Sequence, residues 1–171
     1  MTLIRASRPN VYTGSPLDRA GEKRDDEAWI ADALAHGETL FAPVWRARNL
    51  MRGQPQGEPR GVFLEGEAAA GLRGVAHDWA FLGLLEGRPV FAVDVSGTDD
   101  PAPLVAEGEF VDLRATAGLL PGHDASILAH ARGLLHWRSK HRFCGVCGAA
   151  CAPCAAGSAP TMHPCLPKPA R

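Results

Sequence analysis

The chain has 171 residues, of which 46% are hydrophobic and 22% charged, a composition typical of a globular protein with one ordinary core and a small appendage. Its formal net charge of −1 gives no basic excess of the kind that nucleic-acid-binding or membrane-surface proteins use, so any such partner would have to use a local patch. We expect no DNA or membrane partner. No apolar run approaches the roughly 18 residues of a membrane span, and the N-terminus lacks the apolar segment of a secretion signal. These features predict a cytoplasmic chain.

The first half of the sequence changes from helical to strand-like periodicity. "DDEAWIADALAHG" (25–37) has apolar residues at helical spacing, an Asp suited to cap its start, and Gly37 to end it. "TLFAPVWRARNLMR" (39–52) and "RGVFLEG" (60–66) are strand-like, and "GQPQGEP" between them is typical of an exposed loop. The pattern predicts a short amphipathic helix followed by neighbouring strands.

The second half predicts a hairpin, a further strand and a long helix. "DWAFLGLLEGRPVFAVDVS" (78–96) joins two apolar runs through Gly87, which tolerates a positive φ, and "FVDLRA" (110–115) continues the sheet. "ASILAHARGLLHWRSKH" (125–141) places apolar residues on one helical stripe, with Asp124 near its start and cations at its end. The predicted fold class is therefore α+β, with a mostly antiparallel sheet, flanking helices and an incomplete zinc ribbon behind them.

All five cysteines lie in the last part of the chain, which indicates metal chemistry, because a disulfide framework would distribute them through the fold. In "FCGVCG", Cys144 and Cys147 are separated by two residues and each is followed by glycine, the pattern of one half of a zinc ribbon. A structural zinc site needs four ligands. The expected second pair is His163 and Cys165, while Cys151 and Cys154 are the alternative.

Other interpretations of the cysteines stay open. In one interpretation, the later cysteines and His163 are incidental residues of an Ala/Pro/Cys-rich tail, and only the turn with Cys144 and Cys147 has a function. In another, the cations before Cys144 lower its pKa and make it a nucleophile, although the same cations also suit a zinc site and a helix end. Disulfides are the remaining alternative.

The histidines do not form an evident acid/base site. His36, His77, His130 and His136 have no orienting partner that the sequence reveals, so we interpret them as surface or core residues. The basic run "RSKHR" (138–142) could contact phosphate or an RNA backbone, but cations at a helix end are also expected for dipole reasons.

The order of these segments resembles the N-terminal portion of bacterial NADH pyrophosphatases of the Nudix superfamily, over residues 10 to 157. "NVYTGSPLDR", "PVWRARNL", "GRPVFAVDVS" and above all "LLHWRSKHRFCGVCG" (134–148) carry the likeness. It implies an N-terminal α+β domain (1–122), a connecting helix (123–141) and a zinc-ribbon segment with an irregular tail (142–171). It also implies that Cys144 and Cys147 are the first zinc ligands, that the protein is a homodimer, and that the family reaction is hydrolysis of NAD(H) to NMN(H) and AMP. Some members remove NAD caps from RNA.

The sequence departs from this family near Ser158. The second CxxC has no counterpart, and neither does the Nudix box G-x5-E-x7-R-E-U-x-E-E-x-G-U, whose glutamates hold magnesium or manganese; the last glutamate is Glu109. We therefore expect no hydrolysis by this chain alone, and NAD(H) binding only when it is joined to a Nudix domain. A frameshift or truncation is our hypothesis for the departure. The rival hypothesis is a free-standing zinc-binding scaffold or interaction module.

Overall fold

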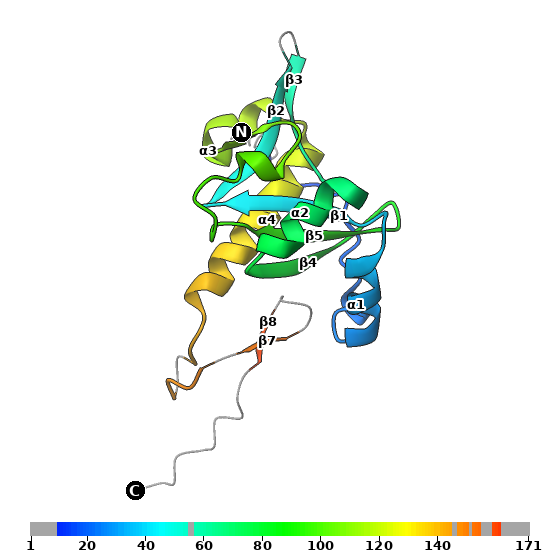
Figure 1. The fold of residues 1–171 in the computed structure, drawn as a ribbon, viewed down its shortest axis with the longest axis vertical. Coiled ribbons are helices and arrows are strands. Elements are labelled where there is room, and N and C mark those ends of the chain that lie inside the picture. The colour runs from blue at the N-terminus through cyan, green and yellow to red at the C-terminus, as the bar shows by residue number, and fades with distance from the viewer. Residues whose placement is uncertain (1–9, 55–56, 145–146, 151, 155–158, 162–171) are drawn as a thin grey trace, which may run out of the picture.

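The computed structural model describes residues 10–54, 57–144, 147–150, 152–154 and 159–161. The strands of the main sheet are β1 (Leu40–Trp45), β2 (Arg48–Gln54), β3 (Gly57–Gly61), β4 (Asp78–Leu85), β5 (Arg88–Asp94) and β6 (Glu109–Val111). The α-helices are α1 (Glu27–Ala35), α2 (Ala70–Val75), α3 (Leu113–Thr116) and α4 (Gly122–Lys140), and 3₁₀ turns span Gly21–Lys23, Gly66–Ala69, Ala102–Leu104 and Ala117–Leu119. A separate pair of short strands, β7 (Ala152–Cys154) and β8 (Ala159–Thr161), follows α4 (Figure 1).

The main sheet has the strand order β3-β2-β1-β5-β4, and β6 also pairs with β2. The β1–β5 pair is parallel, whereas the other strand pairs of this sheet are antiparallel. The predicted α+β class with a mostly antiparallel sheet is confirmed. The hairpin β4–β5 turns at Glu86 and Gly87, where Gly87 has a φ of 83°, as the sequence predicts.

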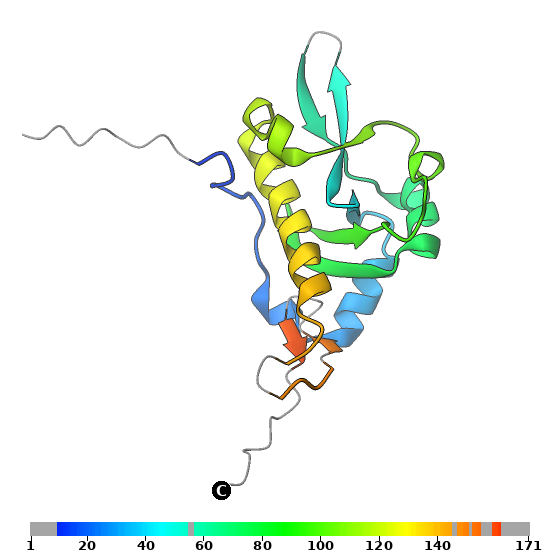
Figure 2. The same ribbon diagram turned by 90° about the vertical axis from the view of Figure 1, so that its left-hand side faces the viewer.

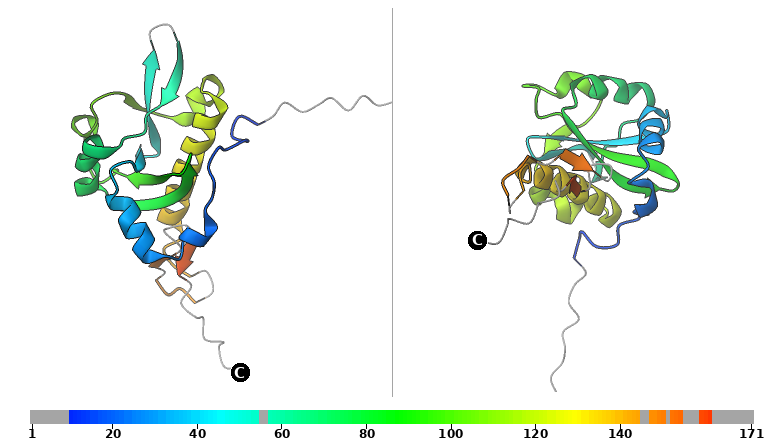
Figure 3. Two further views of the ribbon diagram at one scale, coloured as in Figure 1. Left: turned by 90° about the vertical axis from the view of Figure 1, so that its right-hand side faces the viewer. Right: turned by 90° about the horizontal axis from the view of Figure 1, so that it is seen from below.

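The sheet lies between two layers of helix (Figures 2 and 3). Because successive side chains of a strand point to opposite faces, each central strand contributes to two cores. Alanine and aliphatic residues of β1, β4 and β5 pack with Ile127, Ala131 and Leu135 of α4 on one face. On the other face, Phe41, Phe81 and Phe91 pack with residues of α1 and α2. The three layers bury the sheet on both sides.

Four local expectations need correction. The strand expected at 60–66 ends at Gly61, and beyond it Leu64 forms only an isolated bridge with Phe41. The stretch 39–52 is two strands, since Arg46 and Ala47 adopt positive φ values of 48° and 61° and turn the chain between β1 and β2. The loop expected at 53–59 is shorter, because β2 extends to Gln54 and β3 begins at Gly57. The strand expected at 110–115 ends at Val111, because the Asp112 side chain accepts the Arg114 backbone N–H and begins α3.

The helix α1 begins as the sequence predicts. Asp26 Oδ1 accepts a hydrogen bond of 2.9 Å from the Trp29 backbone N–H, which satisfies one of the donors that a helix start leaves unpaired. The helix ends at Ala35, two residues before Gly37. None of the helices in the described ranges is long and apolar enough to cross a membrane.

The segment before α1 lies along the outer edge of β4. Asp18 and Leu84 exchange two backbone hydrogen bonds of 2.9 and 2.7 Å. The approach occurs beside a β-bulge near Gly83. It requires glycine at position 83, because a Cβ atom there would lie 2.2 Å from the Asp18 carbonyl oxygen. Arg24 then donates to the carbonyl oxygens of Phe81 and Leu82. The edge strand is thus covered by the chain's own N-terminal segment.

Candidate functional site

The first two candidate zinc ligands lie on a tight turn directly after α4. Phe143 and Ala150 form an isolated antiparallel bridge. The Cys144 N–H donates to the Ala149 carbonyl oxygen at 2.8 Å, and the Gly148 N–H donates to the Cys144 carbonyl oxygen at 2.8 Å. Gly148 has a φ of 75°, a conformation that glycine adopts without a Cβ clash. The turn predicted from the glycine after Cys147 is therefore present.

The two cysteines differ in exposure. Cys144 is buried, at 8% exposed, whereas Cys147 is exposed. Two thiolates on one turn suit zinc, which prefers sulfur and nitrogen ligands in a tetrahedral arrangement. The donor chemistry and the turn thus fit one half of a structural zinc site.

The structure does not place the second pair of candidate ligands. His163 and Cys165 lie outside the described residues, and so does Cys151. Cys154 is the last residue of β7, opposite Ala159 of β8. Within the described part of the chain, no group of three or more His, Cys, Asp or Glu residues is arranged to hold a metal ion. The complete ligand set stays a prediction.

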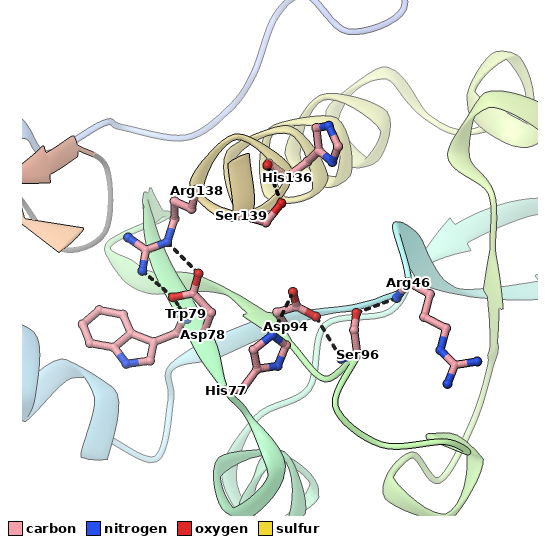
Figure 4. Close-up of polar contacts among 9 residues, drawn as sticks. All are labelled: Arg46, His77, Asp78, Trp79, Asp94, Ser96, His136, Arg138 and Ser139. Carbon is pink, nitrogen blue, oxygen red and sulfur yellow. Dashed lines mark hydrogen bonds and ion pairs between the residues drawn. The ribbon is translucent and has the colours of Figure 1, made fainter. Parts of the chain in front are cut away.

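A polar cluster that the sequence did not reveal lies where the C-terminal half of α4 crosses the ends of β4 and β5 (Figure 4). Asp78, at the start of β4, forms an ion pair with Arg138, whose Nε lies 2.9 Å from Asp78 Oδ2. Asp94, at the end of β5, is opposite Asp78 in the sheet and lies 3.5 Å from His77 Nε2. The sequence carries no local signal for these contacts, because a β-bulge near Gly83 sets the register that places Asp94 opposite Asp78.

This cluster does not have the geometry of a nucleophilic triad. Asp94 Oδ1 accepts the Ser96 backbone N–H at 2.9 Å, while the Ser96 hydroxyl oxygen accepts the Arg46 backbone N–H at 2.7 Å. The 3.5 Å between His77 and Asp94 exceeds a normal hydrogen bond. These contacts tie the β1–β2 turn to the end of β5, which is a structural role.

A small pocket adjoins the cluster, between α4 and the sheet. Its volume is about 150 Å³, and Asp94, Ser96, Arg132, His136 and Ser139 supply its polar lining. Pockets for drug-sized ligands have volumes of roughly 300–1,000 Å³. The pocket is therefore too small to enclose a dinucleotide.

A larger hollow of about 450 Å³ lies beside the start of α4, where Arg60 and His123 meet the buried Asp124. Asp124 Oδ2 accepts hydrogen bonds from Arg60 Nε at 2.7 Å and from the Gly61 N–H at 3.0 Å. His123 Nε2 lies 3.0 Å from Asp124 Oδ1. The Asp124 carboxylate raises the pKa of Arg60. Asp124 does more than start a helix, because it connects α4 to β3.

His130 is placed in the middle of α4 against the N-terminal segment. Arg19 Nη1 lies 2.7 Å from His130 Nε2. Burial, together with the positive charges of Arg19 and Arg24, lowers the pKa of His130 from 6.5 to about 4. A histidine that is neutral at pH 7 and partly buried fits the interpretation as a packing residue.

Comparison with known proteins agrees with this architecture. Residues 38–137, from the start of the sheet to the end of α4, match the model of the family described as NUDIX-like, the NADH pyrophosphatase-like rudimentary NUDIX domain. A curated relative, the NAD-capped RNA hydrolase of Schizosaccharomyces pombe (strain 972 / ATCC 24843), is 38% identical over 64 residues. That match covers 34% of this chain and 17% of the relative, so the chain spans only a small part of the relative's length. The family match covers all strands of the main sheet and most of α4, and the chain therefore belongs to the NADH pyrophosphatase-like rudimentary NUDIX domain family.

Proposed function

We propose that this chain is the N-terminal portion of an NADH-pyrophosphatase-type Nudix hydrolase, consisting of its rudimentary domain and the start of its zinc ribbon. The family match over residues 38–137 carries this proposal. Its support is the direct passage from α4 into the turn that holds Cys144 and Cys147. The chain's role is to support and position a catalytic Nudix domain.

The family reaction would then be hydrolysis of NAD(H) to NMN(H) and AMP, performed when the chain is joined to a Nudix domain. The 171 residues contain no R-E-x-x-E-E cluster, so they lack the carboxylates that would hold magnesium or manganese against a pyrophosphate. The relative named as a NAD-capped RNA hydrolase makes NAD-capped RNA a second substrate class for the same protein. We propose a homodimer as its assembly.

Zinc is the proposed structural cofactor of the cysteine turn, held first by Cys144 and Cys147. His163 with Cys165, or Cys151 with Cys154, would complete the four ligands. Bound zinc would fix the two thiolates on one ion and so stabilise the residues after α4, because metal binding and folding are coupled in such sites.

Zinc content and turnover test the proposal together. The purified chain should bind about one zinc per chain, and with NADH and magnesium or manganese it should release no NMNH or AMP. Turnover that chelation abolishes would contradict the claim that this chain lacks the chemistry. Cys144→Ser should lower zinc affinity sharply. Unchanged affinity would show that the cysteine turn does not bind the zinc ion.

Paired variants distinguish the two ligand sets. His163→Ala with Cys165→Ser should weaken zinc binding if these residues complete the site, and Cys151→Ser with Cys154→Ser is the matched control. The opposite result would assign the second pair to Cys151 and Cys154. Resequencing the coding DNA from the codon of Ala155 onward tests the frameshift, since another frame should encode a second CxxC and a Nudix box.

The rival function is a free-standing zinc-binding scaffold. The chemistry of the cysteine turn, which fits zinc without any need for a catalytic domain, is the observation that favours it. A zinc-loaded chain that stimulates no Nudix domain of its family, with no alternative frame downstream, would support the scaffold over the enzyme fragment.

A further inference from the structure

Charge is distributed unevenly along this nearly neutral chain. All 19 acidic residues lie before residue 125, whereas residues 125–171 contain six lysines and arginines and no acid. Four of the six cations are Arg132, Arg138, Lys140 and Arg142, on α4 or directly after it. A helix C-terminus carries only about half a negative charge, so the dipole does not account for four cations. The local surface is positive although the whole chain is not.

Two of these cations have no acidic partner in the part of the chain that the structure describes. Arg138 forms an ion pair with Asp78, and Arg132 donates to the Ala47 carbonyl oxygen at 2.7 Å. Lys140 and Arg142 are exposed, and none of the ion pairs among the described residues includes them. Their charges are therefore available to an anion from outside.

Aromatic rings accompany these cations. Trp137 and His141 are stacked, with ring centroids 4.7 Å apart and planes inclined by 24°. His141 Nδ1 lies 2.8 Å from the Trp137 carbonyl oxygen, a contact that holds the imidazole in place. His141 is exposed, and Phe143 is 67% exposed.

Three of these residues are neighbours at the end of α4, and Arg142 and Phe143 follow them directly in the chain. Trp137, Lys140 and His141 are spaced i, i+3 and i+4, so they are neighbours on the helix surface. The side of α4 that faces the sheet is formed by other residues, among them Leu128, Ala131 and Leu135, all buried. We call Trp137, Lys140, His141, Arg142 and Phe143 the α4-end surface.

We propose that the α4-end surface binds single-stranded RNA. Lys140 and Arg142 would contact phosphates, while unpaired bases would stack on His141 and Phe143. Sequence-independent binding of single strands combines these two contacts, and paired bases cannot stack on a protein ring. The choice of RNA as the ligand rests on the proposed function, in which NAD-capped RNA is a substrate class. The α4-end surface would hold the RNA strand that follows the cap.

Fluorescence anisotropy of a labelled ten-nucleotide RNA with the full chain tests the proposal. Binding should weaken with salt, with a slope of about −1.4 in log K against log salt if two phosphates are contacted. The double variant Lys140→Gln/Arg142→Gln should lower affinity about tenfold at low salt and flatten the slope. Phe143→Ala should lower affinity at least about fivefold through lost stacking, with little change in slope.

Arg46→Gln/Arg52→Gln is the matched control, because it removes the same charge from two exposed cations of the β2 region, which pair with Asp99 and Glu107. An equal loss of RNA affinity in both double variants would show that binding depends only on the net charge of the chain, and it would overturn the proposal. Equal affinity for duplex RNA would exclude base stacking and overturn the proposal. Absence of binding would also overturn it.

The outcome is separable from that of the proposed function. The anisotropy measurement requires neither turnover nor a Nudix domain. RNA binding by a chain that supports no family activity would therefore support this inference and contradict the proposed function. A chain that restores NADH hydrolysis to a Nudix domain but does not bind RNA would support the proposed function and contradict this inference.

Discussion

The sheet domain and the cysteine turn are joined by one helix, yet the two are held together by different interactions. In the first half of α4, the residues from Asp124 to Leu128 are all buried. Among the described residues from 142 to 150, only Cys144 is buried. The sheet domain is stabilised by apolar burial that needs no ligand, whereas the turn has two cysteines and little burial among its described residues. The comparison teaches that zinc, if it is bound, should matter to one region and not to the other.

The largest effect should come from the core of the sheet. Phe91 is fully buried and its ring contacts those of Phe41, Trp79 and Phe81. Phe91→Ala should lower the free energy of unfolding by about 3–5 kcal/mol, because it removes apolar contacts and leaves a cavity. Urea denaturation followed by tryptophan fluorescence measures the change.

Phe143→Ala is the corresponding change in the turn. It should shift the free energy of unfolding by less than about 0.5 kcal/mol, since Phe143 is 67% exposed. Similar losses from Phe91 and Phe143 would contradict the distinction between the two regions.

An effect between those of Phe91→Ala and Phe143→Ala is expected where α4 meets β3. Asp124→Ala leaves the Gly61 N–H and Arg60 without their carboxylate acceptor, and should cost about 2 kcal/mol. Asp99→Ala, which removes a fully exposed partner of Arg46, is the control and should change little. Thermal unfolding at pH 7 compares the two variants, and equal stability would show that the buried carboxylate does not anchor the helix.

The pH dependence of stability should report on the middle of α4. The folded chain holds the pKa of His130 at about 4, below its usual 6.5, so the unfolded chain binds the proton more tightly. The stability that His130 contributes is complete above about pH 6.5 and is lost as the pH falls toward 4. Urea unfolding should show a loss of about 1 kcal/mol between pH 7 and pH 5, allowing for solvent screening of a partly exposed ring. His130→Gln should remove this part of the loss, and an unchanged pH profile would contradict it.

The smallest effect on the sheet domain should come from chelation. Removing zinc should change the unfolding free energy of that domain by less than about 0.5 kcal/mol, because its apolar clusters include no cysteine. Tryptophan fluorescence in urea, with and without a chelator, measures this. Unfolding of the sheet on chelation would merge the two regions into one cooperative unit.

The elements that the sequence predicts well are those whose pattern is local. The apolar stripe of α4, the Asp26 cap and the turn at Gly87 depend on residues a few positions apart, and all three are present. The parallel β1–β5 pair joins residues about fifty positions apart, and no local pattern encodes it.

The polar cluster around Asp94 was missed for a related reason. A regular hairpin turning at Glu86 and Gly87 would pair Asp94 with Trp79, but the bulge near Gly83 shifts the register so that Asp94 lies opposite Asp78. The bulge depends on the approach of Asp18 from a distant part of the chain. The cysteine turn, in contrast, was predicted because its ligands and its glycine are adjacent in sequence.

The edges of the main sheet limit how copies of this chain could associate. At β4, the N-terminal segment already occupies the carbonyl and N–H groups of Leu84, and Arg24 occupies the carbonyl groups of Phe81 and Leu82. At the opposite edge, β3 contains Pro59, which has no N–H to donate, between the charged Glu58 and Arg60. Neither of these borders can readily accept a foreign strand. The third border, β6, pairs with β2 and is only three residues long, so a continuous intermolecular sheet is disfavoured. The proposed homodimer would therefore have to join through helices or loops.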